Sequence, residues 1–454
     1  IETDPPNEAD VLTEGRSGSD FMIDVLKSLG FDYVCSVAGS SFRALHESVI
    51  NYGGNEKPEF LTCTHEESSV AMGHGYAKVE GKPLCIFAHG TVGLQHASMA
   101  IYNAFCDRVP VFLIVGNNLD ATKRDQAYGE WPHSVQDAAA MVRDYTKWDD
   151  LPISLQHFAE SAVRAYKIAM TPPMAPVLLV ADSELQERPV SPNEPLQIPK
   201  LTLAEPPQGD SGSVREAARM LVQAENPVIV VDRLARTQAG IDRLVELAEA
   251  LQAPVIDQAG RMNFPTQNPL NHSFRRTEMI AEADVILGLE APDFWDVLNK
   301  VHDQIYRSSR PIMRSDAKLI SITANDLYIK SNYQDFFRFV SVDLDIAADG
   351  EETLPSLIEE VKRQTTADRK RAFQDRGAKL AAARHQELEQ ARIDASYAWD
   401  ASPISTARVS AEVWNQIKGE DWSLVSILRH FSWWPLRLWT FDKHYQYIGA
   451  QGGG

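Results

Sequence analysis

The stretch LCIFAHGTVGLQHASMAIYNAFCDRVPVFLIV, residues 84–115, decides the fold of this 454-residue chain. It opens with the apolar run Leu84–Ala88 and closes with Val111–Val115, and the run Ala97–Phe105 between them has helical spacing. Two short apolar runs that flank a helix are typical of neighbouring parallel strands joined by a crossover helix. Since such strands are covered on both faces, the stretch predicts an α/β domain with a doubly wound parallel sheet.

The alternation of short apolar strands and helices continues towards the N-terminus and is found again later in the chain. Towards the N-terminus we expect helices at Phe21–Leu29, Phe42–Tyr52 and Ser68–Val79, and strands at Tyr33–Val37 and Phe60–Thr64. A second unit is expected to have helices at Ser213–Ala224 and Gly240–Leu251, and strands at Pro227–Val231, Pro254–Asp257, Val285–Leu289, Leu319–Ile322 and Phe339–Val342. The sequence therefore predicts consecutive doubly wound parallel-sheet domains.

Composition divides the chain into six segments. They are a polar N-terminal lead (residues 1–20), a first α/β domain (21–186), a linker rich in Pro, Glu and Gln (187–212), a central α/β domain (213–345), a charged helical connector (346–402) and the start of a third domain (403–454). We interpret the connector as a solvated helix rather than a binding tail. The last segment holds five of the nine tryptophans, which is typical of a core or a subunit interface.

The overall composition excludes several classes of protein. The chain is 44% hydrophobic and 24% charged, as in soluble globular proteins, and its net charge of −19 disfavours binding to nucleic acid. No run of eighteen apolar residues occurs, so we expect no membrane span. The four cysteines lack metal-binding spacing and are expected to be buried thiols. We expect a cytoplasmic location, while export to the periplasm after signal removal stays open because the sequence begins at Ile1 without an initiator Met.

The segment Thr64-His65-Glu66-Glu67 follows an apolar run and opens a helix of small residues. By itself Glu66 could be a helix-capping acid or a partner of the helix dipole, and His65 could be structural. The longer stretch His65–Lys78 (HEESSVAMGHGYAK), however, resembles the segment of acetolactate synthases and related thiamine-diphosphate-dependent enzymes that carries a cofactor-activating glutamate. In this sequence, that glutamate is Glu66.

Four further stretches resemble motifs of the same family in the same order. Ser36–Gly39 resembles the Gly-Ile-Pro-Gly turn after the first strand, His89–Gly93 the Ser-Gly-Pro-Gly loop, and Asp107–Val111 the dipeptide and strand that follow. Ser134–Asp137, leading to Tyr145–Trp148, resembles the Phe-Gln-Glu and Thr-Lys segments. Two strands of the central domain and the residues around Trp434 and Tyr445–Gly449 extend the resemblance over nearly the whole chain.

The resemblance implies a pyrimidine-binding domain, a central Rossmann-like domain and the start of a diphosphate-binding domain. It implies that Glu66 lies beside N1′ of thiamine diphosphate and that Gly39, Gly90 and Gly93 line the cofactor pocket. His89 and Gln136 are the further catalytic candidates, for proton transfer or contact with the substrate, although Gln136 could merely cap a helix. Of the four histidines at positions 65, 74, 89 and 96, we expect a functional role for only one.

Two departures from the family pattern limit the expected cofactors. The Gly-Asp-Gly segment ending in Asn, which holds the diphosphate and Mg²⁺ in the family, does not occur in the sequence. We therefore expect the sequence to be part of a longer chain, with the Mg²⁺ ligands outside it and no metal ligand assigned within it. In the central domain Asp232–Arg236 replaces a glycine-rich turn, so FAD is not expected.

The expected function is that of a thiamine-diphosphate-dependent transferase or lyase, which forms or breaks a C–C bond of a 2-keto acid as acetolactate synthase does. A 2-hydroxyacyl-CoA lyase or benzaldehyde-lyase-like activity is the alternative, since fold does not choose among these reactions. An alternative of another class is a non-catalytic assembly homologue that needs a partner chain for the diphosphate site. Because the family's sites lie between subunits, the resemblance implies a homodimer or homotetramer.

Overall fold

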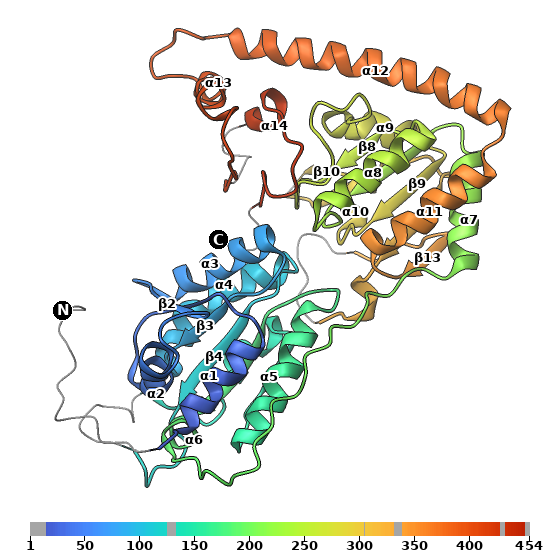
Figure 1. Ribbon diagram of the computed structural model, residues 1–454. Helices are drawn as coiled ribbons and strands as arrows, with labels where there is room; N and C mark the ends of the chain where they lie inside the picture. Colours follow the sequence, from blue (N-terminus) through green and yellow to red (C-terminus); the bar gives the residue numbers. More distant parts are fainter. Residues whose placement is uncertain (1–14, 125–132, 304, 331–337, 427–431, 450–454) are drawn as a thin grey trace. The chain divides into compact units, whose positions relative to one another are not determined.

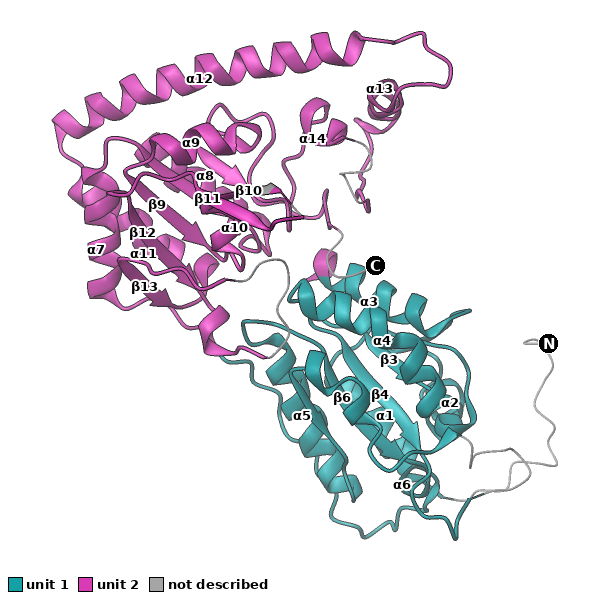
Figure 2. Cartoon of the chain, turned by 180° about the vertical axis from the view of Figure 1, so that it is seen from behind, with its two compact units in different colours: residues 1–77, 82–204, 453–454 teal, residues 78–81, 205–452 magenta. Residues whose placement is uncertain are grey.

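The computed structural model describes residues 15–124, 133–303, 305–330, 338–426 and 432–449. Two compact units divide the chain: residues 1–77 and 82–204 form unit 1, and residues 205–452, with 78–81, form unit 2 (Figure 2). The boundary between residues 204 and 205 falls in the predicted linker, where the structure has no helix between Glu187 and Ser211. Each unit contains a parallel sheet between helices (Figure 1).

Unit 1 is built on a six-stranded parallel sheet, which confirms the predicted fold class. Its strands lie in the order β2-β1-β3-β4-β6-β5. Their bounds are β1 Tyr33–Ser36, β2 Glu59–Thr62, β3 Cys85–Ala88, β4 Phe112–Asn117, β5 Trp148–Asp150 and β6 Val177–Asp182. The strands β3 and β4 and the helix between them form the crossover unit that residues 84–115 predict.

Helices cover both faces of this sheet because alternate strand residues are apolar on both sides. Phe87 and Ile114 pack in one buried cluster with α1 (Gly18–Ser28), α2 (Arg43–Glu47) and α5 (Leu155–Met170). Ile86 and Leu113, one residue earlier in each strand, pack in a second cluster with α3 (Glu66–Glu80) and α4 (Thr91–Cys106). The period of two that separates these pairs is that of a strand buried on both faces. A short helix, α6 (Ser183–Glu187), follows β6.

The order of the strands places a crevice at one point of the sheet edge. Strand β1 has β2 on one side and β3 on the other, so the connection from β1 to β2 and the connection from β3 to β4 run in opposite directions along the sheet. The segments after β1 and β3 therefore diverge, and a ligand can bind between them at the carboxyl ends of the strands. This switch point lies next to the loops that carry the predicted site residues.

Unit 2 has a five-stranded parallel sheet in the order β13-β12-β9-β7-β8 and an antiparallel hairpin, β10-β11. The strands are β7 Pro227–Val231, β8 Val255–Asp257, β9 Val285–Leu289, β10 Asn299–Asp303, β11 Ser308–Pro311, β12 Lys318–Thr323 and β13 Leu344–Ala347. The helices are α7 Ser211–Gln223, α8 Gln238–Leu251, α9 Arg276–Glu282, α10 Phe294–Leu298 and α11 Gly350–Gln364. The two predicted helices and the first four predicted strands are found, with shifts of one or two residues at some ends.

The prediction of a strand at Phe339–Val342 is wrong, because the edge strand is Leu344–Ala347. Val340 and Val342 do pack, partly buried, against the cluster on one face of the sheet. Phe339, in contrast, is 92% exposed. The apolar run therefore reflects local packing of a loop rather than pairing with a neighbouring strand.

The predicted connector, residues 346–402, contains two helices of different character. In α11, Leu354, Leu357 and Val361 are fully buried and belong to the core between the sheet and helices α7 and α8. The second helix, α12 (Ala367–Ser396), is mostly exposed, and Figure 1 shows it running past the ends of the central-domain helices. Only this second helix resembles the solvated helix that we expected.

The remainder of unit 2 carries the aromatic cluster. Helices α13 (Thr406–Ile417) and α14 (Trp434–Leu438) flank it. Trp414, Trp422 and Trp439 pack on one another and on Phe441, with ring centroids 5.1–5.9 Å apart. Trp439 shares a buried cluster with Ala235, Ile241 and Met262 of the central domain, and Trp414 and Trp422 pack against that cluster partly buried. No helix within the described ranges is both long and apolar enough to cross a membrane.

Candidate cofactor-binding site

Three segments that carry predicted site residues leave neighbouring strands at the same edge of unit 1. Gly39 follows β1, Glu66 follows β2, and His89 and Gly90 follow β3. Since β1 lies between β2 and β3 in a parallel sheet, all three segments emerge at the carboxyl end of the strands, beside the switch point. The structure thus brings together motifs that are separated in sequence by up to fifty residues.

Glu66 is the first residue of α3, and it is only 6% exposed. Its Oε2 atom lies 3.3 Å from Nδ1 of His96 on α4. Among the described residues this is the single hydrogen-bond partner of the carboxylate, and no backbone amide of α3 donates to it. A helix-capping acid would accept such an amide, so the burial and the partner favour a ligand-directed carboxylate over a cap.

Two glycines pack closely against this carboxylate and the His89 ring. A Cβ atom on Gly93 would lie 3.0 Å from Oε1 of Glu66 and 2.9 Å from Cβ of His89. A Cβ atom on Gly39 would lie 2.8 Å from the His89 ring. Both positions therefore require the absence of a side chain, and Gly93 links the carboxylate to the imidazole across the crevice. Glu66, His89, Gly39 and Gly93 form one cluster.

His89 is held by residues that the sequence motifs did not single out. Ser41 places its Oγ atom 2.9 Å from His89 Nδ1, and the Gly90 amide donates to that same Oγ at 3.0 Å. The ring of His133 meets the His89 ring edge to face, with centroids 4.5 Å apart. Ser41 and His133 each flank a motif, but only the fold brings the segment after β1 and the segment before Ser134 to the same imidazole.

The other three histidines of the predicted set separate into two roles. His74 Nε2 lies 2.8 Å from the buried carboxylate of Asp107, so it joins α3 to the end of α4. His65 and His96 stack with centroids 5.1 Å apart, beside Glu66. The structure therefore assigns His74 to packing between helices and places His65, His89 and His96 around the crevice.

Gln136 lies on the surface, and among the described residues no hydrogen bond joins it to this cluster. Its neighbour Val135 is anchored to the end of β4, because the Asn117 side chain donates to the Val135 carbonyl at 2.8 Å. The following Thr-Lys motif has a structural explanation. Lys147 Nζ donates to carbonyls near the end of α5, those of Ile168, Thr171 and Pro173, at 3.0, 2.6 and 2.9 Å.

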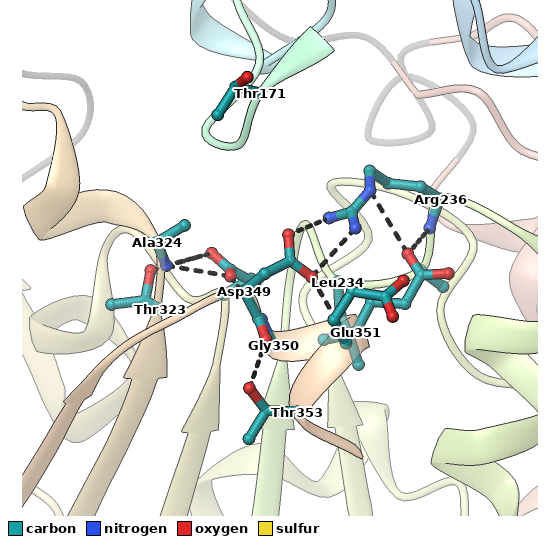
Figure 3. Close-up of polar contacts among 12 residues, drawn as sticks. Thr171, Leu234, Arg236, Thr323, Ala324, Asp349, Gly350, Glu351 and Thr353 are labelled. Carbon is teal, nitrogen blue, oxygen red and sulfur yellow. Dashed lines mark hydrogen bonds and ion pairs between the residues drawn. The ribbon is translucent and has the colours of Figure 1, made fainter. Parts of the chain in front are cut away.

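Unit 2 has its own switch point, but carboxylates of the chain fill the positions where a dinucleotide phosphate would lie. Glu351, only 2% exposed, accepts the Arg236 amide at 2.9 Å and the Thr237 hydroxyl at 2.6 Å (Figure 3). These residues precede α8, and a Cβ atom on Gly240 in its first turn would lie 2.6 Å from Glu351 Oε1. The amino end of this helix, which binds pyrophosphate in Rossmann domains, therefore already contacts an anion.

Further acids complete this network at the carboxyl ends of the strands. Glu290, after β9, accepts the amides of Ala324 and Gly350 at 3.0 and 2.9 Å. The guanidinium of Arg236 lies 2.8 Å from Asp349, and Figure 3 shows it between Asp349 and Glu351. Burial lowers the pKa of Arg236, but the charges of these two carboxylates outweigh burial and raise that pKa. In this network, carboxylates of the chain itself accept the backbone amides at the carboxyl ends of the strands.

The two units differ in what they can hold. In unit 1, a buried carboxylate has one oxygen, Oε1, that is unpaired among the described residues, which suits a hydrogen bond with a ring nitrogen of a ligand. In unit 2, the backbone amide of Arg236 and the hydroxyl of Thr237, which follow β7, already donate to Glu351. Together the fold and the site define a class: α/β proteins that bind a cofactor at the carboxyl edge of a doubly wound sheet.

Comparison with known proteins identifies the family within this class to which the chain belongs. Residues 16–141 match the N-terminal TPP binding domain of thiamine pyrophosphate enzymes, and residues 214–357 match the central domain of the same enzymes. The chain belongs to the thiamine pyrophosphate enzyme family. Thiamine diphosphate is therefore the cofactor that the family implies for unit 1.

Similar proteins within the family differ in their named activities. A probable 2-ketoarginine decarboxylase of Pseudomonas aeruginosa is 27% identical over 64% of this chain and 51% of its own length. An acetolactate synthase large subunit of Haemophilus influenzae is 24% identical over 60% of this chain and 48% of its own. The chain thus spans about half the length of these relatives. Benzoylformate decarboxylase from Polynucleobacter necessarius has the same fold over 96% of the chain, with a TM-score of 0.72 at 16% identity.

Proposed function

We propose that this protein is a thiamine-diphosphate-dependent enzyme that forms or breaks a C–C bond next to the carbonyl of a 2-keto acid, with acetolactate synthase-like carboligation as its reaction. Glu66 carries the proposal, because its buried carboxylate lies at the switch point with one oxygen unpaired among the described residues. The similarity to a decarboxylase and a synthase supports the cofactor, since both are thiamine pyrophosphate enzyme relatives of different activity.

Glu66 has the central role in this proposal. Bound thiamine diphosphate supplies a carbon nucleophile at C2 of its thiazolium ring once its aminopyrimidine is activated at N1′. Glu66 would hold a proton against N1′ and exchange it there. Burial between α3 and α4 keeps bulk water from competing for that hydrogen bond. Gly39, Gly90 and Gly93 would let the cofactor approach the backbone closely.

His89 is the second catalytic candidate of the proposal. Because Ser41 Oγ and the Gly90 amide both lie within hydrogen-bond distance of Nδ1, the neutral ring would carry its proton on Nε2. From there it could donate to a substrate carboxylate or carbonyl oxygen. Gln136 stays a prediction as a substrate contact, and we propose that Mg²⁺ is bound by residues outside this sequence. A homodimer or homotetramer, with sites shared between subunits, completes the proposal.

The proposal for Glu66 is tested by proton exchange at cofactor C2. In full-length protein with Mg²⁺ and thiamine diphosphate, Glu66→Gln should slow H/D exchange at C2, followed by NMR, by at least about 10²-fold, since it removes an acid–base group. Glu67→Gln is the matched control, because Glu67 is the next residue and is exposed. Equal exchange rates in the two variants would contradict the assignment of Glu66.

The substrate is tested separately from the cofactor. A panel of 2-keto acids and 2-hydroxyacyl-CoAs should be incubated with the holoenzyme, with chromatographic detection of products. Carboligation of a 2-keto acid is the expected outcome. Turnover of the acyl-CoA compounds alone would replace the proposed substrate class by that of a 2-hydroxyacyl-CoA lyase.

A further inference from the structure

Glu66 also belongs to a group of three side chains that could bind a metal ion. His65, Glu66 and His96 each offer one ligand atom, and these atoms lie within 4.8 Å of one another. Two of the three, His65 and Glu66, are adjacent at the start of α3, while His96 comes from the second turn of α4. Within the described ranges no other group of three His, Cys, Asp or Glu side chains has this property.

The donor set selects one class of metal ion. Two imidazole nitrogens and one carboxylate oxygen, with a fourth position open, are the ligands of zinc sites that keep an exchangeable position. Late first-row divalent ions prefer such nitrogen-rich sites, whereas Mg²⁺ prefers oxygen ligands and retains its water. The constellation therefore suits Zn²⁺ or Co²⁺ and does not suit the Mg²⁺ that accompanies the cofactor's diphosphate.

The geometry needs little adjustment to bind such an ion. Ligand atoms of a tetrahedral zinc site lie roughly 3.3 Å apart, and His96 Nδ1 already lies 3.3 Å from Glu66 Oε2. The His96 side chain is 57% exposed and that of Glu66 only 8%, so a fixed carboxylate faces a movable imidazole. His65 is exposed too, and its Nδ1 accepts the Glu67 amide at 3.2 Å, a bond that metal ligation through Nδ1 would replace.

We propose that His65, Glu66 and His96 form a binding site for a late first-row divalent cation, and that this cation and thiamine diphosphate exclude each other. The exclusion rests on the proposed function, because both ligands need the carboxylate of Glu66. The metal site itself depends only on the three side chains. Zinc bound there would keep the protein in a form that cannot accept the aminopyrimidine.

Metal binding is tested first, without cofactor. Titration of the protein with Co²⁺, followed by the visible absorption of the bound ion, should show one site that Zn²⁺ displaces and that Mg²⁺ does not. His65→Ala and His96→Ala should each weaken Co²⁺ binding by about 10-fold or more. His385→Ala is the control, because His385 is an exposed histidine on α12. No Co²⁺ binding, or variants that bind as the control does, would overturn the site.

Competition is tested second. Thiamine diphosphate with Mg²⁺ should raise the apparent dissociation constant of Zn²⁺ in wild type, in proportion to the cofactor concentration. Zinc binding that is insensitive to the cofactor would overturn the mutual exclusion while leaving the metal site intact. Failure of the Glu66 assignment itself would show instead as normal C2 exchange in Glu66→Gln, so the two failures are distinguishable.

Discussion

Glu66 and Glu67 are adjacent and chemically identical, yet only Glu66 is buried. The difference comes from the helix face that each occupies, because Glu66 faces α4 at the position where Gly93 has no side chain. Residue type therefore does not identify the functional acid. What identifies it is the combination of a helix start, a buried face and a glycine opposite.

Gly93→Ala should disturb the site far more than the fold. The added Cβ would lie 3.0 Å from Glu66 Oε1 and 2.9 Å from His89 Cβ, so one of these groups must move. In a helix the change from glycine to alanine is favourable by about 1 kcal/mol, which offsets much of the packing strain. We expect C2 exchange of the holoenzyme to fall on the order of 10²-fold, with little change in melting temperature.

The matched control for this substitution is Gly15→Ala, since a Cβ on Gly15 meets no atom within 4 Å. It should leave both the exchange rate and the melting temperature unchanged. If Gly93→Ala exchanged as fast as Gly15→Ala, the close approach of Gly93 to Glu66 would have no part in cofactor activation.

His272 of unit 2 should make stability depend on pH. The ring is fully buried, and contacts with the backbone of Pro269 and Leu380 oppose the lowering of its pKa only in part. Burial first, and then the charges of Arg275 and Arg384, lower the pKa of His272 from 6.5 to about 4. Because the folded-state pKa is the lower one, the unfolded chain takes up the proton first, and stability is lost as pH falls from about 6.5 towards 4.

The measurement compares urea unfolding at pH 7 and pH 4.5. His272 should contribute about 2 to 3 kcal/mol to the difference in unfolding free energy between these pH values. His272→Leu, of similar size and without a titrating group, should reduce the difference by that amount. His385→Leu, at an exposed position, should leave it as in wild type. If the unfolding free energy of all three proteins depended on pH in the same way, the loss of stability at low pH could not be assigned to His272.

Single residues of the site could be predicted from sequence only where a motif contains them. Glu66, His89, Gly39 and Gly93 lie in such motifs, and the structure brings these four together. Ser41 could not be predicted, because its contact with His89 joins residues 48 apart through the arrangement of β1 and β3. Tertiary contacts of this kind carry no local signal in the sequence.

Helix α12 shows the same limit for an entire element. Its charged sequence predicted a solvated helix, and most of the helix is exposed. Nevertheless, Arg369 donates to the Val222 carbonyl at 2.7 Å, and Arg376 donates to the carbonyls of Glu225 and Gln252 at 2.7 and 2.9 Å. Guanidinium groups thus satisfy carbonyls in the last turn of α7 and just beyond the ends of α7 and α8, where no intrahelical donor exists. Charge alone does not reveal which arginines have such partners.

Arg376→Met should therefore destabilise unit 2 although the residue lies on a charged, mostly exposed helix. The substitution keeps the apolar stem and removes hydrogen bonds from a charged donor, so we expect a loss of about 2 kcal/mol in unfolding free energy, measured with urea. The control is Arg371→Met, because Arg371 is exposed and pairs with Asp368 on the same helix. A loss no larger than that of the control would show that the carbonyl contacts contribute nothing.

At the scale of the whole molecule, two doubly wound units of similar topology differ in their carboxyl edges. In unit 1 a buried acid has an oxygen that is unpaired among the described residues, whereas in unit 2 Glu351 and Glu290 accept the backbone donors. The strand and helix pattern in the sequence was enough to predict both folds. It could not predict the filled edge of unit 2, because Glu351 lies 115 residues after the Arg236 amide that it accepts.

The purified protein should consequently bind neither FAD nor ADP in unit 2. A dinucleotide pyrophosphate would have to displace Glu351 from the amino end of α8 and take over the Arg236 amide and the Thr237 hydroxyl that Glu351 now accepts. Equilibrium dialysis with FAD, and flavin absorption after gel filtration, measure this directly. Stoichiometric retention of flavin would show that the carboxylate network opens, and would contradict the prediction that unit 2 does not bind FAD.

Because Glu351 belongs to the chain, its contribution to the stability of unit 2 does not depend on the concentration of a ligand. A Rossmann domain that binds its phosphate from solution gains about 2.7 kcal/mol when the free ligand is at 100 times its dissociation constant, and loses that gain when the ligand is scarce. Glu351 is present at all times, at a fixed position next to α8. The contact between Glu351 and the amino end of α8 therefore stabilises this unit at every ligand concentration.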